Sequence, residues 1–186
     1  MNDSEIIDLY FQRDEQAIVE TDSKYGNFCA YISGNILNNK QDVEECVNDT
    51  YLRTWNSIPP TVPNSLKAYL GRIVRNISLN HFKANHTQKR YAGQADLVYE
   101  EFAAILPSRD MLEDLVDSMQ LREAIVTWLD ALSDIQRAVF VGRYWYFDSI
   151  QIIAEKMNCS PARIKMILHR LRKQLKSYLE AEGYYL

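Results

Sequence analysis

Glycine, proline and cysteine are scarce in this 186-residue chain, which contains six, five and three of them. Because helix-breaking residues are few and apolar residues recur at helical spacing, the sequence predicts an all-α protein. Cys29, Cys46 and Cys159 are odd in number and unrelated in spacing. That pattern argues against a small disulfide scaffold and favours reduced thiols in a cytoplasm.

Long hydrophobic runs are missing as well. No stretch approaches the roughly 18 consecutive apolar residues that a membrane-spanning helix needs. The first 15 residues carry early acids and no apolar core, so we expect no signal peptide. The chain is 47% apolar and 25% charged, which is typical of a folded, soluble protein, and we expect a cytoplasmic location.

Groupings typical of catalysis or of metal binding are also lacking. His81 and His86 lie five residues apart with no cysteine nearby, a poor spacing for a metal. The paired glutamates at 44–45 and 100–101 point in different directions along any helix, which does not suit acid–base catalysis. No glycine-rich phosphate loop occurs. We therefore expect no catalytic site, no metal and no cofactor.

Charge is present in alternating blocks that the net value of −4 hides. Residues 1–52 and residues 94–135 each carry −8, whereas residues 53–93 carry +7 with no acid and residues 136–186 carry +5. A single charged run is usually a solvated face. Two basic blocks, each on a predicted pair of helices, favour a nucleic-acid partner instead.

Apolar periodicity and helix breakers divide the chain into two small helical domains. The first domain spans residues 1–92. In it one helix ends at Ile58, before two prolines. A second helix over 66–76, capped by Asn64 or Ser65, is followed almost at once by another near 77–90. A flexible acidic linker over 93–113 leads to the second domain at 114–186. In the linker, VYEEFAAIL can form a short docked helix.

The carboxy-terminal basic block has the spacing of a helix-turn-helix. Asp148 and Gln151 predict a capping box, Asn158 suits the left-handed conformation of a tight turn, and Ser160 with Pro161 opens a second helix. That helix has a buried stripe and a basic outward face, the arrangement that major-groove reading requires. The residues on or beside the outward face are Ser160, Ala162, Arg163, Lys165, Met166, His169, Arg170 and Lys173. The alternative is an ordinary helical hairpin with a solvated basic face.

Four stretches, in order, resemble motifs of extracytoplasmic-function sigma factors of bacterial RNA polymerase. DVEECVNDTYLRTW and LKAYLGRIVRNISLNHFK are similar to region 2 of that family. LSDIQRAVFVGRY and SPARIKMILHRLRKQL are similar to region 4. The chain departs from the family pattern at Tyr69, Gly71 and Asn80, where the family often has Trp, an aromatic residue and Asp.

The resemblance implies a non-catalytic subunit that directs core polymerase to promoters. The residues it assigns to docking on the clamp helices of the largest subunit are Asp42, Glu45, Asn48, Asp49 and Arg53. The residues it assigns to melted minus-ten DNA are Tyr69, Arg72, Arg75, Asn76, Asn80 and Lys83. Region 4 would read the minus-thirty-five duplex with the outward helix face and contact the polymerase flap. An anti-sigma factor is a further expected partner.

Two other classes stay open at this point. A helix-turn-helix repressor or activator would bind an operator as a dimer, but it would leave the basic block at 53–93 without a role. An RNA-processing enzyme would need turnover on nucleic acid in the absence of polymerase.

Overall fold

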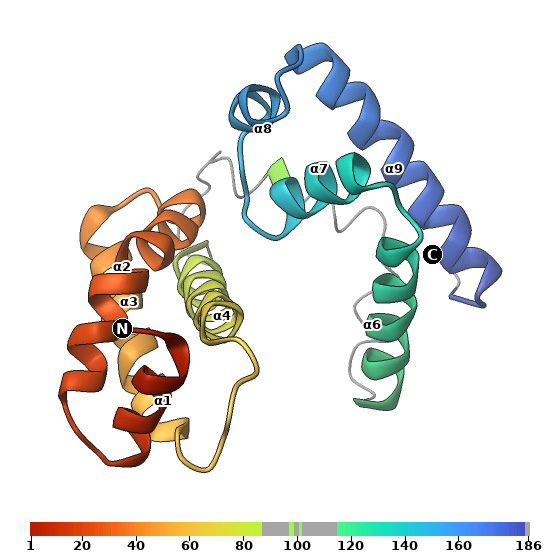
Figure 1. Cartoon of the computed structure of the whole chain (residues 1–186). Helices are drawn as coiled ribbons and strands as arrows, with labels where there is room; N and C mark the ends of the chain where they lie inside the picture. Colours follow the sequence, from red (N-terminus) through yellow and green to blue (C-terminus); the bar gives the residue numbers. More distant parts are fainter. Residues whose placement is uncertain (87–96, 99–100, 102–114, 185–186) are drawn as a thin grey trace. The chain divides into compact units, whose positions relative to one another are not determined.

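The computed structural model describes residues 1–86, 97–98, 101 and 115–184, with the backbone alone at 83, 85–86 and 115–120. These residues form helices and no strand (Figure 1), which confirms the all-α prediction. The chain divides into two compact units, Met1–Gly93 and Gln94–Leu186. The helices of the first unit are α1 (Asp3–Phe11), α2 (Gln16–Ile36), α3 (Lys40–Ser57) and α4 (Leu66–His86). Those of the second are α6 (Leu115–Asp130), α7 (Asp134–Tyr144), α8 (Ile150–Lys156) and α9 (Pro161–Ala181).

The first unit is built on α2, α3 and α4, which pack on one another, while α1 packs on α2. Its core is formed by apolar side chains that recur at helical spacing on each helix, including Ile6, Tyr10, Ile32, Ile36, Cys46, Leu66, Leu70 and Val74. Because each helix has one apolar stripe, the opposite stripe of α3 and of α4 faces water.

Small residues let these three helices approach closely. The buried Ser78 of α4 donates a hydrogen bond of 2.9 Å to Ser33 of α2, and both hydroxyls hydrogen-bond the Cys46 thiol of α3. Gly71 of α4 lies against the ring of Phe28, which a Cβ atom would meet at 3.2 Å. The position therefore has no room for a larger side chain unless Phe28 moves.

The helix α4 runs without a break from Leu66 to His86, so the prediction of separate helices over 66–76 and near 77–90 is wrong. No glycine or proline interrupts residues 72–86. The buried hydroxyl of Ser78 is satisfied inside the core by Ser33. Ser65 is the cap, because its Oγ accepts from the Ala68 amide at 3.3 Å.

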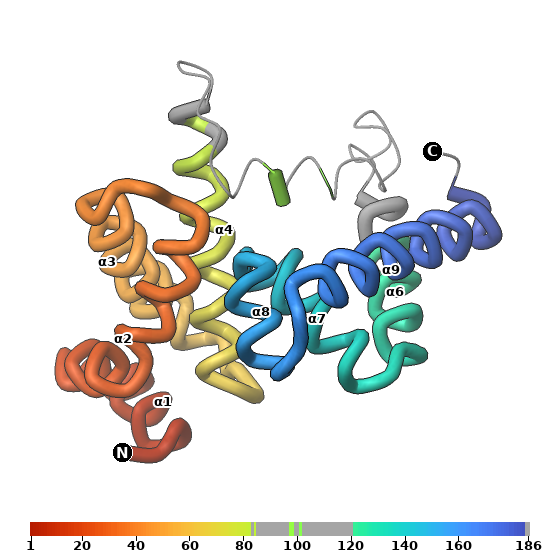
Figure 2. The backbone as a smooth tube through the Cα atoms, turned by 90° about the horizontal axis from the view of Figure 1, so that it is seen from above, coloured from red at the N-terminus to blue at the C-terminus, as the bar shows by residue number. Residues whose placement is uncertain are grey.

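In the second unit, α9 packs in turn against α8, α7 and α6 (Figure 2). The predicted inner stripe of α9 is buried at Ile164, Leu168, Leu171 and Leu175, and only Ile167 is half-exposed. Trp128 of α6 meets Phe140 of α7 edge-on, with ring centroids 5.0 Å apart. These contacts hold α9 against the rest of the unit along its inner side.

The turn between α8 and α9 has the predicted local structure. Asn158 has a left-handed backbone with φ of 48°. Ser160 caps α9 through the Arg163 amide, and Pro161 is the first helical residue. The predicted capping box at Asp148 is wrong, because Ser149 caps α8 by accepting from the Ile152 amide. The buried Asp148 carboxylate instead accepts a 2.7 Å bond from Lys156.

Candidate nucleic-acid interface

The polar stripe of α4 gathers most of the residues expected to hold melted DNA. At about 100° per residue, Tyr69, Arg72, Asn76, Asn80 and Lys83 fall within about 80° of arc on the helix. Arg72, Asn76 and Asn80 are exposed, and Tyr69 is half-buried. The side chain of Lys83 lies outside the described residues. One continuous helix thus presents a cation, two amides and an aromatic ring along one line.

The amino-terminal end of this stripe, at Tyr69, is anchored to α3. The Tyr69 hydroxyl donates a 2.6 Å hydrogen bond to Ser57, which itself donates to the Arg53 carbonyl. The Arg72 guanidinium lies over the Tyr69 ring, 5.5 Å from its centroid. The ring is therefore held in place before any ligand arrives, with one face covered by a cation.

Arg75 differs from its neighbours on α4. It lies about 100° from Asn76 around the helix and is only half-exposed. Burial lowers the pKa of its guanidinium to about 10, so it remains charged at neutral pH. A cation this desolvated suits a role in positioning better than free contact with a phosphate.

The residues expected to dock on polymerase occupy the corresponding outer stripe of α3. Asp42, Glu45, Asp49 and Arg53 fall within about 80° of arc. All are exposed except Asp42, which is half-exposed. Asn48 is exposed as well, but it is rotated toward α2. The stripe carries three acids and one base on an accessible helix face, so it can pair with a basic surface.

Two hollows lie where Asn48 faces α2. One, of about 550 Å³, includes Asp22, Gly26 and Val47 in its lining. The other, of about 540 Å³, includes Val19, Leu52 and Trp55 in its lining. Val19 and Leu52 are each 57% exposed. This side of the first unit thus combines accessible apolar side chains with the acids of α3.

His81 of α4 lies beside the same α3 stripe. Its Nδ1 is 3.9 Å from Asp42 Oδ2, and ligand atoms of Asp42, Glu45 and His81 all lie within 4.8 Å of one another. The neighbouring Asn39 donates a 3.1 Å bond to the other Asp42 oxygen. The sequence analysis considered His81 together with His86. It did not predict the cluster of Asp42, Glu45 and His81, because the two carboxylates belong to another helix.

Every residue predicted to contact duplex DNA is exposed, on the outer face of α9 or beside it. Ser160, Ala162, Arg163, Lys165, Met166, His169, Arg170 and Lys173 are all exposed. Met166 is 50% exposed although it is apolar. Since the inner stripe is buried against α6, α7 and α8, this outer face is free to enter a groove.

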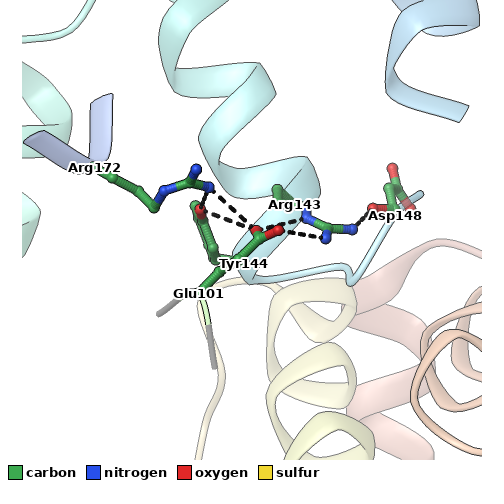
Figure 3. A network of polar contacts seen from close by, with 5 residues as sticks. All are labelled: Glu101, Arg143, Tyr144, Asp148 and Arg172. Carbon is green, nitrogen blue, oxygen red and sulfur yellow. Dashed lines mark hydrogen bonds and ion pairs between the residues drawn. The ribbon is translucent and has the colours of Figure 1, made fainter. Parts of the chain in front are cut away.

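The short docked helix that VYEEFAAIL allows is seen at residues 97, 98 and 101, which are helical, but the polar network that it forms was not predicted. Glu101, from the predicted linker, accepts hydrogen bonds from Arg143 of α7 and Arg172 of α9 (Figure 3). Val98, three residues earlier, is buried. The signal that could have indicated it is the pairing of an apolar residue with an acid at helical spacing in VYEEFAAIL.

Comparison with known proteins matches both units. Residues 23–87 match Sigma-70 region 2, and residues 128–177 match Sigma-70, region 4. The two ranges cover more than half of the chain and include every site residue named in the predictions. The chain belongs to the sigma-70 family. It is similar to the ECF RNA polymerase sigma factor SigX of Bacillus subtilis (strain 168), with 27% identity over 149 residues, covering 78% of this chain and 74% of that protein.

Membership of the sigma-70 family settles the function class that the motifs indicated. The chain is a sigma factor of the ECF type, a non-catalytic protein that acts in transcription initiation with core RNA polymerase and promoter DNA. The region 4 match includes α8, the turn and α9 as far as residue 177. Within the described part of the chain, no helix combines the length and apolar character of a membrane span.

Proposed function

We propose that the stripe on α4 captures the melted minus-ten strand and that the outer face of α9 reads the minus-thirty-five duplex. The observation that carries the proposal is the line of Tyr69, Arg72, Asn76 and Asn80 on one helix, turned away from the core. Amides can hydrogen-bond an unstacked base, and a cation beside them can hold the phosphate backbone of a single strand.

The acidic stripe of α3 would dock on the clamp helices of the largest polymerase subunit. Asp42, Glu45, Asp49 and Arg53 supply the charge, and the exposed Val19 and Leu52 nearby supply apolar surface. Region 4 would contact the flap, and an anti-sigma factor would cover these surfaces until it is released. We expect the protein to act in the cytoplasm, where polymerase and promoters are found.

Transcription with purified core polymerase tests the proposal directly. The full chain should co-purify with core and start transcription at a defined promoter, and start sites across the genome should share a minus-ten and a minus-thirty-five element. If the chain bound core but promoter use did not depend on the minus-ten sequence, the role given to α4 would be wrong.

A further inference from the structure

A short part of the acidic connector is docked on the region 4 unit. We refer to Leu97, Val98 and Glu101 as the strap. All three are helical, and Val98 is only 1% exposed whereas Leu97 is 57% exposed. Burial of one apolar side chain and outward placement of the next are typical of a docked amphipathic turn. The strap lies between the two ranges that match the sigma-70 regions.

The Glu101 carboxylate is the centre of the docking. Arg143 donates to both of its oxygens, from Nε at 3.2 Å and from Nη2 at 3.1 Å (Figure 3). Arg172 donates from Nη1 at 3.3 Å and also reaches the Tyr144 hydroxyl at 2.9 Å. This is a bidentate pair with one arginine and a single bond with a second, the stronger class of hydrogen bond.

The two arginines differ in their surroundings. Arg143 is 4% exposed and gives its remaining nitrogen to the Asp148 carbonyl at 3.1 Å, so it is part of the core. The side chain of Arg172 is 27% exposed and projects from α9, the helix whose outer face is assigned to DNA. Of these two cations, Arg172 is the one with access to a ligand.

Glu101 also reaches the edge of the DNA face. A hollow of about 340 Å³ is lined by Glu101, Arg172, Lys165 and His169, together with Ile150 and Leu168. Lys165 and His169 belong to the outer face of α9, and Arg172 follows them about one turn later toward its edge. The strap thus places a carboxylate at the flank of the recognition surface, beside the cations that would meet phosphates.

We propose that the strap is an internal acidic ligand of region 4 that weakens duplex binding by the free protein. Docked, Glu101 holds Arg172 in an intramolecular pair and lowers the positive potential beside Lys165. When the strap leaves, Arg172 is free to contact a phosphate and the flank of α9 becomes more basic. The effect acts on backbone contacts, because the strap lies at the edge of the face and away from the front of the helix. The inference rests on the assignment of α9 to duplex DNA.

The test measures binding of the full-length protein to a minus-thirty-five duplex and to a scrambled duplex, by fluorescence anisotropy over a range of salt. Glu101→Gln keeps an oxygen for Arg143 and removes the charge. We expect it to tighten binding to both duplexes about threefold to tenfold at low salt. The plot of log affinity against log salt should steepen by about one unit, as one more phosphate contact requires. Glu123 is an exposed acid on α6. Glu123→Gln makes the same change in net charge and should alter neither the affinity for the duplexes nor the salt dependence.

A double-mutant cycle shows whether Arg172 carries the effect. Glu101 acts mainly by holding Arg172 and only partly through the potential beside Lys165, so the gain from Glu101→Gln should be much smaller in an Arg172→Gln background. A gain of equal size in that background would overturn the mechanism. Equal affinities of the wild-type protein and of folded Glu101→Gln would overturn the proposal as a whole.

Loss of the Glu101 charge beside the buried Arg143 can unfold the unit, so a second variant is needed. Val98→Ser undocks the strap and leaves every cation in place, and it should also tighten duplex binding. If Val98→Ser is folded and binds no more tightly, the proposal fails. Absence of duplex binding by the wild type and by all variants would refute the assignment of α9 to DNA, and the proposal with it.

Discussion

Asn76 is an exposed amide in the middle of the α4 stripe, between Arg72 and Asn80. The core side of α4 is filled by Leu70 and Val74, so packing does not determine which side chain stands at this exposed position. An amide offers a donor and an acceptor together, which is what recognition of a base edge requires. At the residue scale, the proposal for α4 therefore depends most on this side chain.

Asn76→Ala should lower initiation from a promoter with a defined minus-ten element by about tenfold, since a good amide–base pair is worth about 1–3 kcal/mol. Affinity for core polymerase should not change, because Asn76 is on α4 and the proposed docking stripe is on α3. Abortive transcription and a core-binding assay give the two values. Asn38→Ala, which alters an exposed amide outside both stripes, serves as the control. Equal loss of both activities would contradict a role in base capture.

Arg170→Ala should weaken minus-thirty-five binding and reduce its salt dependence by about one unit of slope, if the guanidinium contacts a phosphate. Arg170 is exposed on the outer side of α9. The measurement is anisotropy with a duplex at several salt concentrations. Arg122→Ala removes an exposed arginine from α6 and should leave the slope unchanged. An unaltered slope in Arg170→Ala would remove that residue from the DNA face.

At the scale of elements, patterns local in sequence predicted local structure well. The cap at Ser160, the left-handed Asn158 and the buried stripe of α9 were predicted because each depends on residues a few positions apart. The continuity of α4 was not predicted, although no glycine or proline interrupts residues 72–86. What the sequence could not show is the partner of its buried Ser78, which is Ser33, 45 positions away. The Glu101 network joins residues 42 and 71 positions apart, and no spacing rule reaches that far.

The turn between α8 and α9 gives a test of this local reasoning. Asn158 has φ of 48°, which glycine adopts freely and a β-branched residue does not. Asn158→Gly should therefore be close to neutral in stability, whereas Asn158→Val should destabilise the second unit by about 1–2 kcal/mol. Urea unfolding of both variants measures the difference. Equal stability of the two would contradict the left-handed conformation.

At the scale of the whole molecule, and among the residues that the structure describes, more groups with a raised pKa lie in the first unit than in the second. Desolvation by burial raises the pKa of Cys29 to about 12, and the charge of Asp22 adds to the effect. Burial also raises the pKa of Cys46, Tyr10, Tyr25 and Tyr51 in the first unit, and of Tyr144 in the second. The neutral form of each group is the one that the fold accommodates, so alkaline pH should destabilise the first unit.

The direction and the size of this pH effect on stability can be worked out for Cys29. Its ordinary pKa of 9.0 is raised in the folded state, so its contribution to stability is complete below about pH 9 and is lost as pH rises toward 12. Between pH 8 and pH 10 the free energy of unfolding should fall by about 1 kcal/mol on this account. Urea titrations under reducing conditions at both pH values measure the fall. Cys29→Ala should show a smaller fall, and an identical fall would assign the pH dependence to other groups.

Because α4 is one unbroken helix, the number of residues between its polar side chains decides whether they lie on the same face. Each residue advances the helix by about 1.5 Å and turns it by about 100°. One alanine inserted after Ile73 would turn Asn76 and Asn80 away from the line of Tyr69 and Arg72, and it would also carry Ile77 and Ser78 out of the core. The helical register of α4 therefore determines both the packing of the first unit and the positions of its polar side chains. A substitution on this helix can change one contact, whereas an insertion or deletion between Tyr69 and Asn80 would disturb the core and the polar stripe together.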